Sequence, residues 1–360
     1  MAVLCNHKAV KLAIIGGGAA GMYAAATAAS RHLSTVLFER KARLGSKVLM
    51  TANGRCNFTK DIPAERFLSD LGDCAGFLRQ AIRESPPRSI VKDIESLGVK
   101  TRRMADGRIF PADGKAATIV HAFGDYLRDE DVPVITNCAV EHIAKSKNYF
   151  IVSCRNFTLA AENVLIATGG VSYPKTGSVG DGQRIAHELG HRLVPYKPGL
   201  IGLETNDRRV TDRAPRRFEE SRAKVQTLAG ETLFEYRGEI DCEKFGLSGA
   251  AIYNCQRFIA HHELRNYKLE VAFDHEKFCL QNLSPRPVKE AIVTIGGVAT
   301  DEIEPETMQS KLVEGLYFAG EVMDIDGPTG GYNLTLAFAT ARKAVTAIAA
   351  KELKAGNKRR

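Results

Sequence analysis

The chain has 360 residues, of which 44% are hydrophobic and 26% charged, and its formal net charge is +8 at pH 7. This composition is typical of a globular protein, and the length allows two domains and a large core. No apolar stretch approaches the ~20 residues needed to cross a bilayer, and the first ten residues lack the features of a secretory signal. We therefore expect a cytoplasmic protein without a membrane partner.

The cysteines and the charge distribution exclude several further classes. The cysteines are scattered without a C-x-x-C pair or a metal-like Cys/His spacing, so we expect reduced thiols, no bound metal and no flavin–disulfide chemistry. Much of the Lys/Arg excess lies in the tail 351–360 and in the region 208–222. We interpret this excess as solvated charge and do not expect a nucleic-acid partner. The eight cysteines are Cys5, Cys56, Cys74, Cys138, Cys154, Cys242, Cys255 and Cys279.

The segment 11–60 has the pattern of a dinucleotide-binding βαβ unit. A short apolar strand leads into a glycine-rich turn over 16–21, an Ala-rich helix and a second strand that ends at Glu39. The start of such a helix offers N–H groups to phosphates. Gly16 permits a tight bend, Gly18 permits close approach of a pyrophosphate, and Gly21 permits close packing of the helix on the strand.

The position of Glu39 narrows the choice of dinucleotide. A carboxylate at the end of the second strand can accept hydrogen bonds from both hydroxyls of an adenosine ribose, and it disfavours a 2′-phosphate. The sequence therefore predicts FAD or NAD rather than NADP. The alternative is a purely structural turn in another α/β fold.

The rest of the chain predicts an α/β domain with an insertion. Helices are predicted at 67–97 with a break at Pro86-Pro87, and at 116–128, 183–189 and 334–350. Strands are predicted at 108–111, 133–135, 139–143, 150–154, 163–167, 291–298 and 316–318. Between the strands at 163–167 and 291–298, short β-like runs occur at 200–203, 223–228, 232–236 and 269–273. The predicted domains are thus a Rossmann-like parallel sheet with helices, formed by 1–197 and 291–360, and an inserted β-rich substrate domain over 198–290.

Four blocks of sequence together resemble one flavoprotein family. The resemblance is to the BaiN/RdsA-type, aminoacetone-oxidase-like flavoproteins, a branch of the two-dinucleotide-binding-domain FAD superfamily, and it spans both ends of the chain. The blocks are Gly16–Gly21; Leu44–Lys47 with Asn53–Asn57; Ala167–Gly170 with Ser172–Gly177 and Gly180–Gly182; and Gly296–Val298 with Leu316–Glu321 and Gly330–Leu334.

The resemblance implies a non-covalently bound FAD. The residues that it assigns to the cofactor are Gly16, Gly18, Ala19, Ala20 and Gly21 at the pyrophosphate, Glu39 at the ribose, Arg40, Lys47, Asn53, Gly54 and Arg55 along the pyrophosphate and flavin, Val140 at the adenine, Ala167, Thr168 and Gly169 at a second nucleotide turn, Gly320 and Glu321 at the ribitol, and Gly330, Gly331, Tyr332, Asn333 and Leu334 at the flavin pyrimidine.

The last of these placements has an independent physical basis. A helix start aimed at N1 and O2 of the flavin stabilises the negative charge that appears on reduction, so this turn would tune the reduction potential. The alternative is a turn that only starts a helix.

One feature departs from the family as the resemblance describes it. Its members carry a helical cap in the second domain, shortly before the strand that contains 296–298. Here only 274–290 separates a strand-like run from that segment, so the cap is predicted to be absent or reduced to a loop. A cap normally excludes water from the flavin, which puts activities of capped relatives in doubt.

Four residues are candidates for catalysis. Arg55 and Asn57 belong to the block expected near the flavin, and Tyr173 and Lys175 follow the carboxyl end of a strand, where open α/β sheets bind ligands. Surface or packing roles are the alternatives, as they are for a weaker candidate, Lys115. We expect structural roles for the remaining titratable residues near these blocks, namely Cys56, His121, His187 and His191.

These observations predict an FAD-dependent oxidoreductase that acts on a small organic molecule. It would be either an oxidase of an amine such as aminoacetone, with dioxygen as acceptor, or an NAD(P)H-driven reductase. Since the chain has one dinucleotide fingerprint, NAD(P)H would dock transiently. The alternatives are a flavin-dependent RNA-modifying enzyme, and an FAD-loaded binding or sensor protein without turnover.

Overall fold

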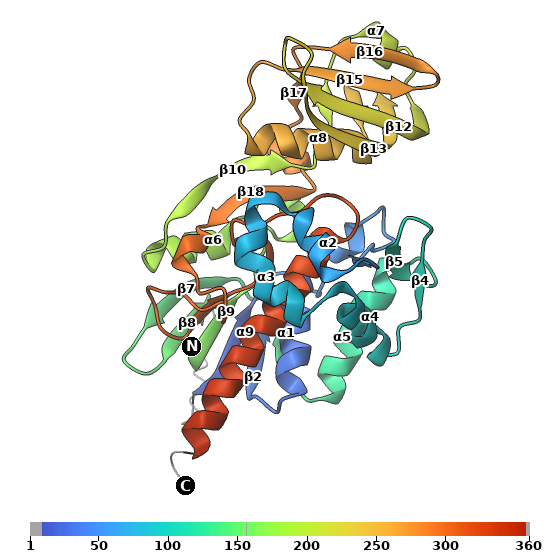
Figure 1. Ribbon diagram of the computed structural model, residues 1–360. Coiled ribbons are helices and arrows are strands. Elements are labelled where there is room, and N and C mark those ends of the chain that lie inside the picture. Colours follow the sequence, from blue (N-terminus) through green and yellow to red (C-terminus); the bar gives the residue numbers. More distant parts are fainter. Residues whose placement is uncertain (1–8, 156, 358–360) are drawn as a thin grey trace. The chain divides into compact units, whose positions relative to one another are not determined.

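The chain folds into two units, which the computed structural model describes over residues 9–155 and 157–357 (Figure 1). Cys5 and the last residues of the basic tail lie outside the described residues. Within these limits, unit 1 comprises 1–170, 174–194 and 296–360, and unit 2 comprises 171–173 and 195–295.

The short segment 171–173 was predicted in the first domain but belongs to unit 2. The backbone N–H groups of Val171 and Ser172 donate to the hydroxyl of Thr294 at 2.8 and 3.1 Å. These bonds attach the segment to the strand by which the chain leaves unit 2.

A seven-stranded sheet forms the centre of unit 1, in the order β6-β2-β1-β9-β8-β7, with β19 also paired to β9. β1, β2, β6, β9 and β19 are mutually parallel, and β8 is antiparallel to both of its neighbours. The predicted α/β class is confirmed. The strands are β1 (Val10–Ile15), β2 (Thr35–Phe38), β6 (Val134–Ile135), β7 (Val140–Lys145), β8 (Phe150–Cys154), β9 (Phe157–Ile166) and β19 (Leu316–Phe318).

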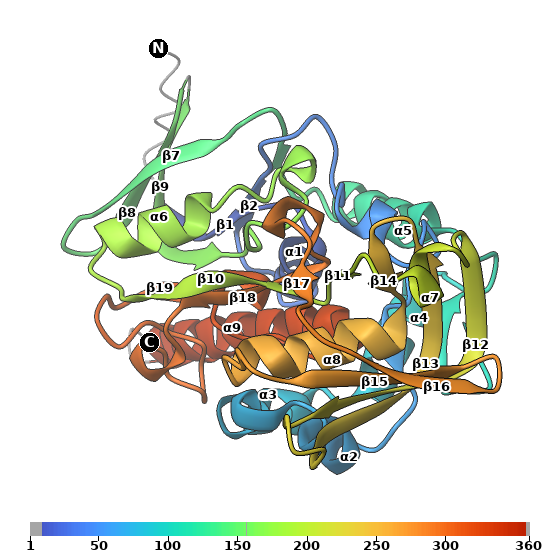
Figure 2. The ribbon, with the colours of Figure 1, turned by 90° about the horizontal axis from the view of Figure 1, so that it is seen from above.

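Two helices dominate unit 1. α1 (Ala19–Ala29) and α9 (Tyr332–Asn357) lie side by side and pack against each other (Figures 1 and 2), and α1 also contacts β1 and β2. The short side chains of α1 allow this close packing on several sides. The other helices of unit 1 are α2 (Ala64–Ser69), α3 (Ala75–Glu84), α4 (Pro87–Ser96), α5 (Ala116–Asp129) and α6 (Asp181–Glu188).

The helix predicted over 67–97 is in fact three helices. The break at the proline pair is where α4 begins, with Pro87 in its first turn, a position where the missing N–H costs nothing. The second break, at Gly72, was not predicted; its φ of +68° is outside the helical region. A small antiparallel sheet completes unit 1, with strands β3 (Thr59–Lys60), β4 (Thr101–Arg103) and β5 (Arg108–Pro111).

The chain passes into unit 2 along β10 (Leu193–Gly199) and returns along β18 (Val293–Val298). These two strands pair with each other in a separate two-stranded sheet. Unit 2 is therefore a nearly continuous insertion whose first and last strands are neighbours.

Unit 2 contains a second seven-stranded sheet, in the order β16-β15-β12-β13-β14-β11-β17. The strand predicted over 200–203 is wrong except at its end, because Leu200 has a φ of +55°, outside the extended region. The strands are β11 (Leu203–Glu204), β12 (Arg216–Gln226), β13 (Thr232–Glu243), β14 (Gly246–Ser248), β15 (Lys268–Phe273), β16 (Glu276–Leu280) and β17 (Ser284–Pro285).

Unit 2 also contains helix, which the prediction of a β-rich domain missed. The short α7 (Arg208–Thr211) precedes β12, and α8 (Ala250–His261) packs on β12, β13 and β14. Ile252 and Cys255 of α8 are fully buried in an apolar core shared with the sheet. The unit is thus a sheet covered by a helix, which gives it a core of its own.

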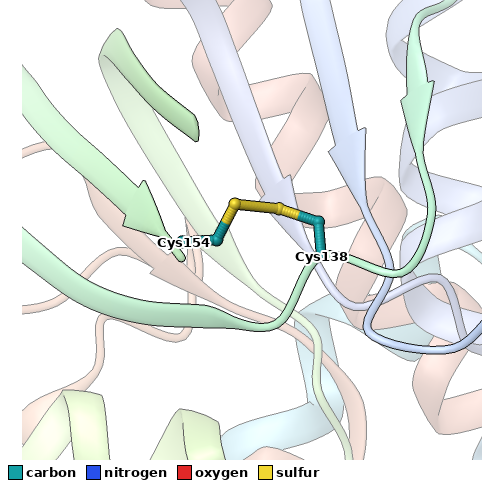
Figure 3. The surroundings of a disulfide bond; sticks show 2 residues. All are labelled: Cys138 and Cys154. Atoms are coloured by element: carbon teal, nitrogen blue, oxygen red, sulfur yellow. A yellow bond between two sulfur atoms is a disulfide. The ribbon is translucent and has the colours of Figure 1, made fainter. Parts of the chain in front are cut away.

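A disulfide in unit 1 corrects the expectation of reduced thiols. Cys138 and Cys154 are bonded, with their Cα atoms 6.1 Å apart (Figure 3). Cys138 lies two residues before β7, and Cys154 ends β8, so the bond closes the open end of this hairpin. Among the described residues no helix is long and apolar enough to span a bilayer. The cytoplasmic location stays a prediction.

Candidate dinucleotide site

The glycines of the turn after β1 differ in what requires them. A Cβ atom on Gly21 would lie 1.7 Å from the carbonyl oxygen of Gly16, and one on Gly16 would lie 2.7 Å from that of Ala167. Both glycines are therefore required by packing within the protein. A Cβ on Gly18 would meet no protein atom within 4 Å, so open space lies beside this residue.

The open space lies at the start of α1. Gly18 is the N-cap of this helix and provides no side-chain hydrogen bond, and no acidic residue occurs in the first turn. The first N–H groups of a helix lack intrahelical partners and carry partial positive charge. Free N–H groups beside open space are the features that an anion site at a helix start requires, and pyrophosphate binding here stays a prediction.

Glu39 is 8% exposed and holds the neighbouring backbone. Its Oε2 accepts from the N–H of Gly17 at 2.8 Å, and its Oε1 accepts from the N–H of Lys41 at 2.7 Å. Burial raises the pKa of the Glu39 carboxyl, whereas these two donors act in the opposite direction. Each oxygen keeps a lone pair that can accept from a further donor, and the ribose role of Glu39 stays a prediction.

Two ion pairs link predicted cofactor residues to distant parts of the chain. The Lys47 ammonium lies 2.7 Å from a carboxylate oxygen of Glu321. The Arg40 guanidinium lies 2.5 Å from Asp181, the first residue of α6. Both pairs are partly buried, so each holds a cation and its hydrogen-bonding oxygens in a fixed position.

The turn between these cations and β3 is strained. Ala52, Asn53 and Cys56 have φ values of +48°, +55° and +58°, and Gly54 between them has a φ of +80°. Non-glycine residues in the left-handed region cost about 1–2 kcal/mol each. Such strain persists where function requires it, and consecutive N–H groups in this conformation form anion-binding concavities. Asn53 and Arg55 are exposed on this turn.

A third glycine turn, at the start of α9, is held from two sides. Gly331 has a φ of +96°, and a Cβ there would lie 2.6 Å from the backbone of Thr59. The hydroxyl of Thr335 donates to the carbonyl oxygen of Gly331 at 2.8 Å. The side chain of Asn333 donates to the carbonyl oxygen of Gly327 at 2.9 Å. No acidic residue occurs in the first turn of α9.

The second nucleotide turn contains a contact that sequence reasoning missed. Gln183 of α6 is fully buried, and its Nε2 donates to the carbonyl oxygen of Gly169 at 3.0 Å. Its Oε1 has no hydrogen-bond partner among the described residues. Such an orphaned acceptor is rare and fits a ligand donor. The preceding Gly180-Asp181-Gly182 block was recognised, but it was not extended to the residue after it.

Other predicted cofactor residues also lie in unit 1. Val140 is buried and begins β7, beside the disulfide. Gly320 has a φ of +73°, and its N–H donates to the hydroxyl of Thr340 at 3.0 Å. The turn that contains Ala167 and Thr168 follows β9 directly.

The four catalytic candidates are divided between the two units, and their role stays a prediction. Arg55 is exposed, with its guanidinium carbon 5.6 Å from the ring centroid of Phe110. Tyr173 belongs to unit 2, where burial and the Glu290 carboxylate raise its phenol pKa. Lys175 belongs to unit 1 and is exposed. Asn57, the fourth candidate, makes backbone contacts that are described below.

The other titratable candidates have structural surroundings. His191 is buried, and its Nε2 lies 2.8 Å from the hydroxyl of Ser310. Burial raises the pKa of the Cys56 thiol to about 12, which keeps it protonated. Lys115 is exposed and directly precedes α5, and His121 and His187 are exposed on α5 and α6. No group of three His, Cys, Asp or Glu residues that could hold a metal occurs in the described part of the chain.

Comparison with known proteins identifies the family. The sequence profile of the HI0933-like protein Rossmann domain matches residues 10–347. The chain belongs to the HI0933-like family. The resemblance inferred from the four sequence blocks is thereby confirmed.

Two HI0933-like relatives cover nearly the whole chain. A 3-dehydro-bile acid delta(4,6)-reductase of Clostridium scindens is 28% identical over 401 residues, which is 92% of this chain and 97% of the relative. A ribosomal RNA dihydrouridine synthase of Escherichia coli is 27% identical over 396 residues, which is 91% of this chain and 95% of the relative. The predicted general class, an oxidoreductase, is confirmed.

Solved structures share the fold at low identity. A quinol fumarate reductase of E. coli has a TM-score of 0.60 at 15% identity and covers 99% of this chain and 72% of its own. A 3-ketosteroid delta1-dehydrogenase from Sterolibacterium denitrificans has a TM-score of 0.61 at 13% identity and covers 95% of this chain and 99% of its own.

The alignments also reveal a difference in length within the HI0933-like family. The alignment with the bile acid reductase spans 401 positions, but 92% of this 360-residue chain is about 331 residues. About 70 positions of the alignment are therefore gaps in this chain. In the structure, β16 and β18 are joined by a connection that contains only β17 and one 3₁₀ turn, Val288–Glu290. The helical cap that the family resemblance describes has no counterpart among these described residues.

Proposed function

We propose that this protein is an FAD-dependent reductase that reduces a carbon–carbon double bond conjugated to a carbonyl group. The observation that carries the proposal is the pair of helices α1 and α9. They pack against each other, and each begins at a glycine turn with no acidic residue in its first turn. One helix start suits a pyrophosphate, and the other suits a ring edge that becomes negative on reduction.

The chain's own residues bind and orient the cofactor. Bound FAD would supply hydride transfer. The space beside Gly18 would receive the pyrophosphate, and Glu39 would hold the ribose. Lys47 and Glu321 would bind the ribitol through a donor and an acceptor already fixed by their ion pair. The N–H groups at the start of α9 would stabilise negative charge on the flavin pyrimidine.

The relatives' names support the choice of reaction. A 3-dehydro-bile acid delta(4,6)-reductase acts on double bonds in a molecule with a 3-oxo group, and a dihydrouridine synthase saturates a ring bond next to a carbonyl. Both reactions add hydride to an electron-poor carbon. We therefore favour the NAD(P)H-driven reductase over the dioxygen-coupled amine oxidase, with NAD(P)H as a transient donor.

An RNA substrate is the second candidate, because one relative is named for ribosomal RNA. The charges of unit 2 argue for a small molecule instead. Six arginines of the basic region 208–222 are each within 4.0 Å of an acidic partner, which weakens the attraction of that surface for phosphates. These pairs are Arg208–Asp212, Arg209–Asp207, Arg213–Glu276, Arg216–Asp274, Arg217–Asp241 and Arg222–Glu270.

Anaerobic titration of the FAD-loaded protein tests the proposal. NADH or NADPH is expected to bleach the flavin absorbance, and an enone such as a 4-en-3-one steroid is expected to restore it. Restoration by uridine-containing RNA, with binding that weakens steeply as salt rises, would favour the RNA-modifying alternative. Bleaching by an amine, followed by peroxide formation in air, would favour the oxidase. No bleaching of the flavin by any donor would favour the FAD-loaded binding or sensor protein without turnover.

A further inference from the structure

The side chain of Asn57 connects three backbone segments of unit 1. The surrounding network orients its amide nitrogen toward the carbonyl oxygens of Thr59 and Ile109, at 2.9 and 3.3 Å, and its amide oxygen accepts from the N–H of Gly331 at 3.1 Å. Ile109 lies on β5 and Thr59 on β3, whereas Gly331 lies in the turn that starts α9. One amide therefore links the small sheet to the glycine turn.

A second set of contacts joins the same two segments. The hydroxyl of Thr335, in the first turn of α9, lies 2.8 Å from the hydroxyl of Thr59, and both residues are fully buried. The Thr59 backbone also occupies the space that any side chain on Gly331 would need. The glycine turn is thus held against β3 by two hydrogen-bonding side chains and by direct backbone contact.

Only an amide satisfies this position. It must donate to two carbonyl oxygens and accept from one N–H, and neutral Asn can do both with one planar group. A carboxylate would have no donor, and an aliphatic side chain would leave the Gly331 N–H and two carbonyl oxygens without this partner.

We propose that Asn57 is a positioning residue that holds the Gly330–Gly331 turn, and so fixes the direction of the N–H groups that begin α9. This inference rests on the proposed function, in which those N–H groups face the flavin pyrimidine. By engaging the Gly331 N–H itself, Asn57 leaves the next N–H groups of the helix to act on the cofactor. Asn57 then sets the reduction potential without being a catalytic residue.

The test compares Asn57→Ala with a matched control, Asn163→Ala. Asn163 on β9 is buried, and its amide also bonds to the backbone, donating to the carbonyl oxygen of Lys11 at 3.0 Å. The first measurement is amide hydrogen exchange of the cofactor-free protein, read on a peptide that covers 326–338. We expect faster exchange of this peptide in Asn57→Ala than in wild type or in the control.

The second measurement is made on the FAD-loaded protein. Asn57→Ala is expected to raise the FAD dissociation constant about tenfold and to shift the oxidised-to-reduced ratio about tenfold toward oxidised flavin, which is about 30 mV for a two-electron couple. If Asn57→Ala fails to fold, Thr335→Val, which removes only the hydroxyl, is expected to shift both quantities about threefold in the same direction.

The outcomes separate this inference from the proposed function. Wild-type protein that takes up no FAD would overturn both. Wild-type protein that binds FAD, with variants that keep its potential and its dissociation constant, would overturn the role of Asn57 alone. An equal shift in Asn163→Ala would also overturn that role, because the effect would then follow from general loss of stability.

Discussion

Replacing Gly18 by alanine should weaken FAD binding without weakening the fold. The new Cβ would meet no protein atom within 4 Å, and the φ of −80° suits any residue. Alanine lowers the entropy of the unfolded chain, which stabilises the folded state by about 0.4–1 kcal/mol. Alanine is also a poorer N-cap than glycine, which destabilises the helix by a similar amount, so the two effects nearly cancel. The free energy of unfolding of the cofactor-free protein should therefore change by less than about 1 kcal/mol.

The effect on the cofactor should be much larger. The methyl group would occupy the space where the pyrophosphate meets the start of α1. The helix–anion interaction is worth up to about 2 kcal/mol, and hydrogen bonds to a charged group are worth about 1.5–3 kcal/mol. Losing about 2–4 kcal/mol raises the dissociation constant of FAD by about 30-fold to 1,000-fold.

Fluorescence titration of the cofactor-free protein with FAD measures this constant, and thermal unfolding without FAD measures stability. Gly76→Ala on α3 is the matched control, because its Cβ also meets nothing within 4 Å; it should leave FAD binding unchanged. Gly21→Ala should instead destabilise the fold, since its Cβ would lie 1.7 Å from a carbonyl oxygen. Wild-type FAD affinity in Gly18→Ala would refute the assignment of the pyrophosphate to this space.

Three further predictions concern other parts of unit 1. Glu39→Gln should raise the FAD dissociation constant at least about tenfold, because a neutral amide binds ribose hydroxyls less strongly than a carboxylate does. An unchanged dissociation constant in the same titration would contradict the assignment of Glu39 to the ribose. Joint replacement of Cys138 and Cys154 by alanine opens a loop of 16 residues. It should lower the free energy of unfolding of the oxidised protein, measured by urea denaturation, by about 3 kcal/mol. Equal urea midpoints for the two proteins would show that the disulfide contributes nothing to stability. Burial raises the pKa of the Cys56 thiol to about 12, so at pH 8 about one thiol in ten thousand would be ionised and Cys56 should resist iodoacetamide. The exposed Cys279 should react. Mass spectrometry of the labelled peptides distinguishes the two cysteines.

The sequence predicted the parts of the fold that follow from local pattern. The strands over 35–38, 150–154 and 316–318 were placed correctly, because short apolar runs buried in a sheet are bounded by turn residues. The glycine turn and its terminal acid were recognised because the spacing within a βαβ unit is fixed by sterics.

The features that the sequence missed depend on distant partners. α8 was overlooked because its buried face includes polar Asn254 and Gln256, which obscure the apolar periodicity; Gln256 is satisfied by the backbone of Pro198 and Ile201. The disulfide depends on the register of β7 against β8, which cysteine spacing does not reveal.

Asn57 shows the same limit within the site. Its block was predicted to lie near the flavin and Asn57 was named as a candidate for catalysis, but the backbone contacts of its amide were not predicted. Its amide bonds to backbone groups on β3, on β5 and at the start of α9, and none of these contacts can be read from the residues beside it.

The pairing of β10 with β18 has a consequence for how this family diversifies. Neighbouring strands lie about 5 Å apart, so a two-residue hairpin could join them where unit 2 is now inserted. Recombination could therefore exchange unit 2 while the chain path of unit 1 is kept intact.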